Sequence, residues 1–186
     1  GVGVAASGRG GGAAEGGKTD AERVCGAAVS TGAVNEVVPY VGEVKDDAVK
    51  ALIEDYKSKD GVAPGRLESR YDSLCAAAKE EAGMVNMMND YGTTAGVDNF
   101  EDLGTLSQLP GVGAQRFPSE YGWGFSAEGD WKTAVLVRIA SVMGYGLDGG
   151  ASLMGDYSYN FVPGHEKIMG SHLLEVSPSV GTRANP

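Results

Sequence analysis

The spacing of apolar residues predicts two amphipathic helices in the first half of the chain. The first begins at Asp46, a good N-cap residue, and ends before the breaker sequence DGVAPG at 60–65. Its apolar face follows the i, i+3, i+4, i+7 spacing of an α-helix and consists of Val49, Leu52, Ile53 and Tyr56. The second helix is predicted over residues 68–90, with a stripe of Tyr71, Leu74, Ala78, Ala82 and Val85. It also carries three methionines that are expected to fill gaps in the core, Met84, Met87 and Met88.

A third helix, over residues 131–143, is almost entirely apolar. Asp130 is a good N-cap for it, and Gly144 is a natural residue to follow its end. Because so few of its residues are polar, we expect this helix to be buried on most sides. Residues 27–41 are rich in β-branched side chains and indicate a strand or a mixed structure.

Strict alternation of apolar and polar residues predicts two strands near the end of the chain. On the first strand the apolar face consists of Ala151, Leu153, Tyr157, Tyr159 and Phe161. On the second it consists of Ile168, Gly170, His172, Leu174 and Val176. A two-residue turn at Pro163-Gly164 would place residue 162 opposite 165 and residue 155 opposite 172. We expect an antiparallel hairpin whose apolar face, including Tyr157, is largely buried, by its own chain or by another one.

Composition and charge narrow the classes of function. The chain has 186 residues, 42% of them hydrophobic, which is enough for one domain or one and a half. A net charge of −10 argues against partners such as nucleic acids and anionic membrane surfaces. We see no apolar run of about 20 residues and no signal-peptide pattern, so a cytoplasmic protein is expected. Cys25 and Cys75 lack metal-site spacing, and two reduced thiols are expected.

The first 17 residues contain eight glycines and few side chains that could be buried. Their opening letters, GVGVAA, weakly match a phosphate-binding loop. Such a loop needs a strand before it and a helix directly after it, and this context is missing. We interpret the segment as a flexible tail or an edge strand.

Glu128 is an isolated carboxylate two residues before the N-cap of the apolar helix. The positive end of a helix favours the ionised form of a carboxyl group. Glu128 is therefore a candidate acceptor for a metal ion or a substrate hydroxyl, although a capping or ion-pairing role is an alternative. His172 faces the apolar side of the hairpin, where a histidine is usually a core residue satisfied by its neighbours.

Four consecutive motifs resemble those of the L-arabinose isomerase family in order and spacing. They are FEDLGTLSQLPGVGAQR (100–116), AEGDWKTAVLVRIASVM (127–143), GGASLMGDYSYNF (149–161) and GSHLLEVSPS (170–179). The resemblance covers the family's central domain and the start of its C-terminal domain. It implies an enzyme that interconverts an aldose and a ketose, L-arabinose and L-ribulose, with bound Mn²⁺. It also implies a cytoplasmic homo-oligomer, a trimer or a hexamer, acting on a small sugar.

The resemblance also assigns roles to single residues. Glu128, in AEGDW, and His172, in GSH, match two of the family's four metal ligands, and Glu128 also matches a catalytic acid or base. Phe100 and Tyr157 match positions that line the sugar pocket. Where the family has a second metal-binding glutamate, in MEDY, this chain has Gly155, in MGDY. The alternative function is therefore an inactive fragment or paralogue with a structural or sugar-binding role.

Together these features predict an α/β fold in which sheet and helices form layers. Residues 1–17 are a poorly defined Gly-rich segment, and residues 18–144 form a central α/β domain. Residues 145–186 contain an antiparallel β-hairpin that begins a second, mostly β domain.

The shared site makes a geometric prediction. We expect the Glu128 carboxylate and the His172 imidazole to converge on one cleft, because both match ligands of the same metal ion. The distance between the two groups in a crystal structure of the chain measures this. A separation as wide as the domain would refute the site assignment.

Overall fold

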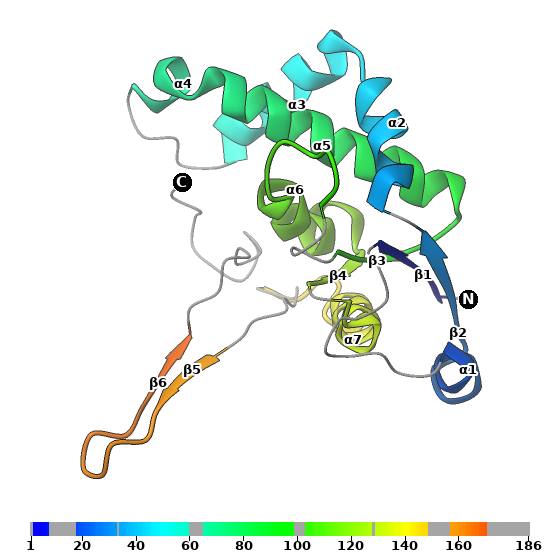
Figure 1. Cartoon of the computed structure of the whole chain (residues 1–186), viewed down its shortest axis with the longest axis vertical. Helices are drawn as coiled ribbons and strands as arrows, with labels where there is room; N and C mark the ends of the chain where they lie inside the picture. The colour runs from blue at the N-terminus through cyan, green and yellow to red at the C-terminus, as the bar shows by residue number, and fades with distance from the viewer. Residues whose placement is uncertain are drawn as a thin grey trace.

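The computed structural model describes residues 2–7, 18–32, 34–59, 65–98, 103–127, 129–148 and 157–170. They form a small parallel sheet with helices on both sides, followed by an antiparallel strand pair (Figure 1). The predicted α/β class, with a hairpin near the C-terminus, is therefore confirmed. None of the described helices is both long and apolar enough to span a bilayer.

The main sheet has four parallel strands in the order β2-β1-β3-β4. Their bounds are β1 (Val2–Ser7), β2 (Ala27–Gly32), β3 (Ala95–Val97) and β4 (Gly124–Ser126). Val4 pairs with Val29 on one side and Ala95 on the other, so β1 lies inside the sheet. The expectation of a tail or an edge strand is wrong for this stretch. The Gly-rich sequence around this stretch concealed an interior strand that is paired on both sides.

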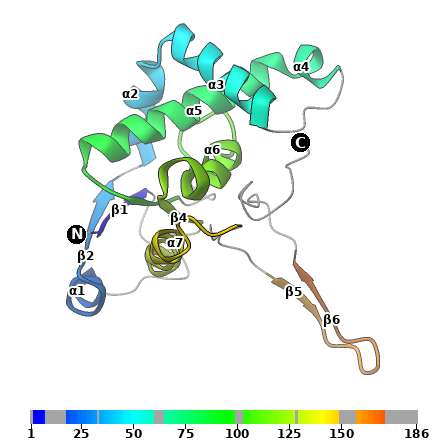
Figure 2. The same cartoon turned by 180° about the vertical axis from the view of Figure 1, so that it is seen from behind.

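Helices and turns connect these strands because parallel strands need crossover connections. The helices are α1 (Lys18–Asp20), α2 (Val37–Gly42), α3 (Asp46–Lys59), α4 (Arg66–Ser69), α5 (Tyr71–Asp90), α6 (Gly111–Arg116) and α7 (Trp131–Met143). Shorter helical turns are η1 (Ala21–Cys25), η2 (Val34–Glu36) and η3 (Phe117–Tyr121). Figures 1 and 2 show α2, α3, α5 and α6 on one side of the sheet and α7 on the other.

The two predicted amphipathic helices form, the first as predicted and the second with changes in its extent and its buried face. Helix α3 begins at Asp46 and buries Val49, Ile53 and Tyr56, as the spacing predicts. The longer helix is interrupted at Arg70, so that α4 and α5 are separate. The buried face of α5 is rotated from the predicted stripe and consists of Ala77, Ala78, Glu80, Glu81, Gly83, Met84, Met87 and Met88. The three methionines are core residues, as expected, and pack with Phe117 and Phe125.

Helix α7 is capped as predicted, because the Asp130 carboxylate accepts a 3.1 Å hydrogen bond from the Thr133 backbone N–H. One face, including Trp131, Ala134 and Val135, packs on the sheet. The opposite face is apolar but exposed: Leu136 is 63% exposed, and Ile139 and Val142 are also open to solvent. The expected burial on most sides is therefore not found in a single chain. Gly144 follows the end of the helix as predicted, and its φ of −82° lies in the right-handed region.

The hairpin consists of β5 (Tyr157–Asn160) and β6 (Lys167–Gly170). Tyr157 pairs with Gly170, the register predicted from a Pro163-Gly164 turn. Gly164 has φ 78°, and the His165 N–H donates to the Val162 carbonyl at 2.8 Å, as in a type II turn. The predicted pairing of residues 155 and 172 lies outside the described residues.

The described part of the hairpin's apolar face is exposed in the single chain. Tyr159 and Phe161 stack with ring centroids 5.6 Å apart, yet they are 56% and 78% exposed. Figures 1 and 2 show the strand pair standing away from the helices. Burial of Tyr159 and Phe161 would therefore have to come from another chain or domain.

The contact between β4 and α7 depends on a glycine. A Cβ atom at Gly124 would lie 2.0 Å from the Ala134 carbonyl oxygen. We expect Gly124→Ala to lower the free energy of unfolding by about 1–3 kcal/mol, since strand and helix would have to separate. Urea unfolding measures the change. The matched control is Gly42→Ala, where an added Cβ would meet nothing within 4 Å and stability should be nearly unchanged. Equal stability of both variants would contradict the close packing.

Candidate functional site

The carboxyl ends of β3 and β4 meet at one edge of the sheet, where backbone hydrogen bonds hold them together. The Asp98 N–H donates to the Ser126 carbonyl at 3.2 Å, and the Gly129 N–H donates to the Asp98 carbonyl at 3.2 Å. In open α/β sheets, ligands bind outside the carboxyl ends of the strands, where neighbouring connections diverge. The order β2-β1-β3-β4 places such a point between β1 and β3.

For the sequence-predicted site residues, the structure describes mainly their neighbours in the chain. Glu128 follows Ala127, which is fully buried at the end of β4, and precedes Gly129, which has φ 76°. Glu128, Phe100 and His172 themselves lie outside the described residues. Tyr157 is the first residue of β5, and only its backbone is described. The convergence of Glu128 and His172, and the pocket-lining roles of Phe100 and Tyr157, therefore stay predictions.

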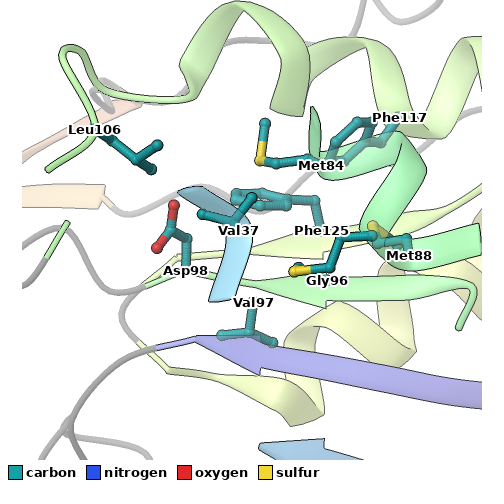
Figure 3. A pocket seen from close by; sticks show the side chains of 10 residues that line it. Val37, Met84, Met88, Gly96, Val97, Asp98, Leu106, Phe117 and Phe125 are labelled. Carbon is teal, nitrogen blue, oxygen red and sulfur yellow. The ribbon is translucent and has the colours of Figure 1, made fainter. Parts of the chain in front are cut away.

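A small cavity lies next to the end of β3 (Figure 3). Its volume is about 30 Å³, room for roughly one or two water molecules. It is lined by Val37, Met84, Met87, Met88, Gly96, Val97, Asp98, Leu106, Phe117 and Phe125. Asp98 is 5% exposed and is the charged group among these apolar side chains. The cavity is too small for a sugar, and all its lining except Asp98 is apolar.

A buried ion pair that the sequence pattern did not indicate lies next to this lining along the chain, because Arg116 directly precedes Phe117. The Arg116 Nε donates to the Glu81 Oε1 at 3.1 Å, and both side chains are almost completely buried. Glu81 also accepts hydrogen bonds from the hydroxyls of Tyr56, at 2.6 Å, and Tyr121, at 3.3 Å. Arg116 in addition pairs with Asp55 and lies over the Tyr56 ring, 4.8 Å from its centroid. The cluster joins α3, α5, α6 and η3.

Burial and charge shift the pKa values of Glu81 and Arg116 in opposite directions. Burial raises the pKa of Glu81, and the Tyr56 hydroxyl and Arg116 offset this only in part. Burial lowers the pKa of Arg116, but the Glu81 and Asp55 carboxylates outweigh it, so the net pKa is raised. Burial, followed by the Glu81 charge, raises the pKa of Tyr121 to about 12. Arg116 therefore stays charged and keeps the Glu81 carboxylate partnered in the interior.

The described ranges contain no group of three or more His, Cys, Asp or Glu side chains that could hold a metal ion. Cys25 is exposed and Cys75 is half-buried, and both are free, as expected from their spacing. The donors expected at a metal, Glu128 and His172, belong to the segments outside the described residues.

Removing the cation from the buried cluster should have a large, pH-dependent effect. We expect Arg116→Met to lower the free energy of unfolding by about 3–5 kcal/mol near pH 8, because Glu81 loses its buried partner. The folded-state pKa of Glu81 then lies above its unfolded value of about 4.3. The penalty should therefore grow as the pH rises above that value, and shrink toward pH 5 as Glu81 takes up a proton.

Urea unfolding at the two pH values measures this difference. Lys59→Met is the control, because Lys59 is 43% exposed where it pairs with Asp55 and Glu120. Its loss should cost about 1 kcal/mol or less. A penalty for Arg116→Met that does not change with pH would contradict the role assigned to Glu81.

Comparison with known proteins accounts for nearly the whole chain. Residues 7–146 match the model of the L-arabinose isomerase central domain, and residues 150–186 match that of the L-arabinose isomerase C-terminal domain. The chain is similar to the L-arabinose isomerase of Bifidobacterium adolescentis, with 74% identity over 172 residues. This match covers 92% of the chain and 34% of the relative.

Two further relatives extend this similarity. The L-arabinose isomerase of Bifidobacterium animalis subsp. lactis is 72% identical over 172 residues, again 92% of the chain and 34% of the relative. That of Clavibacter sepedonicus is 48% identical over 170 residues, 90% of the chain and 34% of the relative. The chain thus spans about a third of the length of these relatives. From these matches we conclude that the chain belongs to the L-arabinose isomerase family.

Proposed function

We propose that this chain is the central part of an aldose–ketose isomerase that converts L-arabinose to L-ribulose. The observation that carries the proposal is the 74% identity over 172 residues to a protein named for that activity. Because the chain spans 34% of that relative, the complete activity would belong to a longer polypeptide. The chain would supply part of the wall of the site and part of its reactive groups.

Glu128 would act as the acid or base that moves a proton between C1 and C2 of the sugar. Its position supports this role, because it lies between the buried end of β4 and the capped start of α7. The positive end of a 13-residue helix favours an ionised carboxylate, the form that can accept a proton. Phe100 and Tyr157 would contact the sugar from the neighbouring loop and from the hairpin.

We further propose that Glu128 and His172 bind Mn²⁺. A carboxylate oxygen and an imidazole nitrogen suit this ion. When bound, the metal would hold the sugar oxygens and stabilise negative charge that develops on them. Two protein ligands from this chain leave further positions to water or to residues outside it. Gly155 provides no ligand, which favours the second candidate function, an inactive fragment or paralogue that keeps a structural or sugar-binding role.

A homo-oligomer in the cytoplasm completes the proposal. The exposed rings of Tyr159 and Phe161 support it, because a monomer would leave this stacked pair in water. Residues 18–144 would form the central domain, and residues 145–186 would begin the C-terminal one.

The experiment that tests the function is a chimera. The matching segment of the Bifidobacterium adolescentis enzyme is replaced by this chain, once with Gly155 and once with Gly155→Glu. We expect ketose formation in the Gly155→Glu chimera, and a rate lower by about 10²–10⁴-fold with Gly155, because one carboxylate is missing. Calorimetric titration should show Mn²⁺ binding at least about tenfold tighter in the Gly155→Glu form.

The control is Glu128→Gln in the active chimera, which should abolish turnover. A folded Gly155→Glu chimera without ketose formation would overturn the isomerase proposal. Full activity with Gly155 would overturn the ligand set, and equal Mn²⁺ affinities would mean that residue 155 does not face the metal.

A further inference from the structure

Glu80 is a buried side chain on α5 that the proposed reaction does not use, and it is 2% exposed. Its Oε1 oxygen accepts hydrogen bonds from the backbone N–H groups of Ser107, at 3.2 Å, and Gln108, at 3.1 Å, and from the Ser107 hydroxyl, at 3.3 Å. The Gln108 side-chain amide also donates to the Ser73 carbonyl on the same helix. Three bonds thus converge on one oxygen from a single loop, residues 103–108, and Glu80 fixes this loop to α5.

Holding the loop requires a hydrogen-bond acceptor at residue 80 and does not require its charge. Burial raises the pKa of Glu80, and the hydrogen bonds from Gln108 and Ser107 offset this only in part. A carboxylic acid keeps one carbonyl oxygen, so Oε1 can accept the three bonds in either protonation state. The Oε2 oxygen is buried and has no hydrogen-bond partner within the described part of the chain. A glutamine at this position should therefore hold the loop in the same way.

The loop contacts the region at the end of β3, where the site is proposed. The Leu106 N–H donates to the Leu103 carbonyl at 3.1 Å, and the Leu106 side chain packs against the core cluster that contains Phe117. Leu106 also lines the small cavity beside Asp98 (Figure 3). A displacement of the loop would therefore change the packing next to the strand end.

The stretch of chain that contains Phe100 has a fixed point on each side. Before it, the Asp98 N–H bonds to the end of β4, and the Asp98 carbonyl accepts from Gly129, the residue after Glu128. After it, the loop is held by Glu80. The position of this stretch relative to Glu128 thus depends on both fixed points, and one of them is a single buried side chain.

We propose that Glu80 is a positioning residue for the sugar in the isomerase reaction, and that it acts through the 103–108 loop without touching the sugar. This inference rests on the proposed function, in which Phe100 contacts the sugar and Glu128 moves the proton. A residue that contacts the sugar without moving a proton binds the ground state and the transition state about equally. Displacing the loop should therefore raise KM and leave kcat nearly unchanged.

The test uses the Gly155→Glu chimera as the parent enzyme. Glu80→Met keeps the volume of the side chain but removes the acceptor, and it should raise KM for L-arabinose at least about tenfold, with kcat changed by less than about threefold. Glu80→Gln keeps an acceptor oxygen, and both constants should stay within about threefold of the parent. Glu80→Ala replaces Glu80→Met if the latter does not fold. L-arabinitol has no carbonyl group and cannot be isomerised, and its dissociation constant, measured by calorimetry, should follow KM.

Val49→Ala is the control that separates positioning from loss of stability. Val49 is 4% exposed in the core cluster beneath α3 and makes none of the loop contacts. Its truncation leaves a cavity and should lower the urea midpoint. A smaller folded fraction lowers the apparent kcat, because fewer molecules are active, but KM of the remaining enzyme should equal that of the parent.

A second measurement does not depend on turnover. In the ¹⁵N-labelled 186-residue chain, hydrogen exchange of the Ser107 and Gln108 amides is followed by NMR. The reference is the Gly124 amide, which donates to the Thr94 carbonyl in the sheet. Relative to this reference, the two loop amides should exchange at least about tenfold faster in Glu80→Met than in the parent chain.

Each contrary result overturns the proposal. Unchanged exchange at Ser107 and Gln108 would show that Glu80 does not hold the loop. A lower kcat at unchanged KM, as in Val49→Ala, would leave Glu80 a structural role alone. Failure of Glu80→Gln to keep KM near the parent value would show that the acceptor is not what positions the sugar.

The outcomes also separate this proposal from the isomerase proposal. Ketose formation by the parent chimera together with an unchanged KM in Glu80→Met overturns the positioning role alone. A folded parent chimera that neither forms ketose nor binds L-arabinitol overturns both.

Discussion

The architecture depends on the buried pair of Glu81 and Arg116. Two opposite charges in the interior are stable only when they are paired, and here Glu81 is the better satisfied of the two, because the Arg116 Nη1 has no hydrogen-bond partner among the described residues. The donors come from α3, η3 and α6, so the carboxylate on α5 is fully satisfied only when all these segments are assembled. The pair thus specifies one arrangement of the helical layer, which general hydrophobic contact alone would not do.

This requirement extends to the sheet through close packing. A Cβ at Gly113 would lie 2.9 Å from the Glu81 Cβ, so α6 can approach α5 closely only because residue 113 has no side chain. Directly after α6, Phe117 packs edge-on against Trp123 and Phe125, which lead into and form β4. The end of β4 in turn precedes Glu128 and the cap of α7. Arg116 of the ion pair, the aromatic residues between 117 and 125, and Glu128 therefore follow one another along this part of the chain.

The sequence predicted elements whose signal is local. The spacing in α3, the Asp130 cap and the turn at Pro163-Gly164 depend on neighbouring residues, and all three form as expected. The interior position of β1 could not be predicted, because it depends on pairing with distant strands and its small side chains carry no periodic pattern. The buried face of α5 differs from the predicted stripe because it includes Glu80 and Glu81, two carboxylates that an apolar pattern leaves out. Their partners are 25 to 40 residues away, and only the fold brings them together.

The candidate site also has a part that local sequence patterns predict and a part that depends on the fold. Motif resemblance identified the family, and the comparisons confirm it. The fixed neighbours of Glu128 follow from the cap and from the strand end. The convergence of Glu128 with His172 depends on how the hairpin and the segments around it meet the sheet, which no local pattern specifies.

The exposed apolar face of α7 affects how the isolated chain would behave in solution. Leu136, Ile139 and Val142 occupy a surface that a longer polypeptide or an assembly would be suited to cover. In isolation such a face promotes non-specific association, and a net charge of −10 counters this only in part. Polar replacements at these three positions would leave the Trp131 face of the helix untouched. They are the natural first changes in engineering a soluble form of the domain.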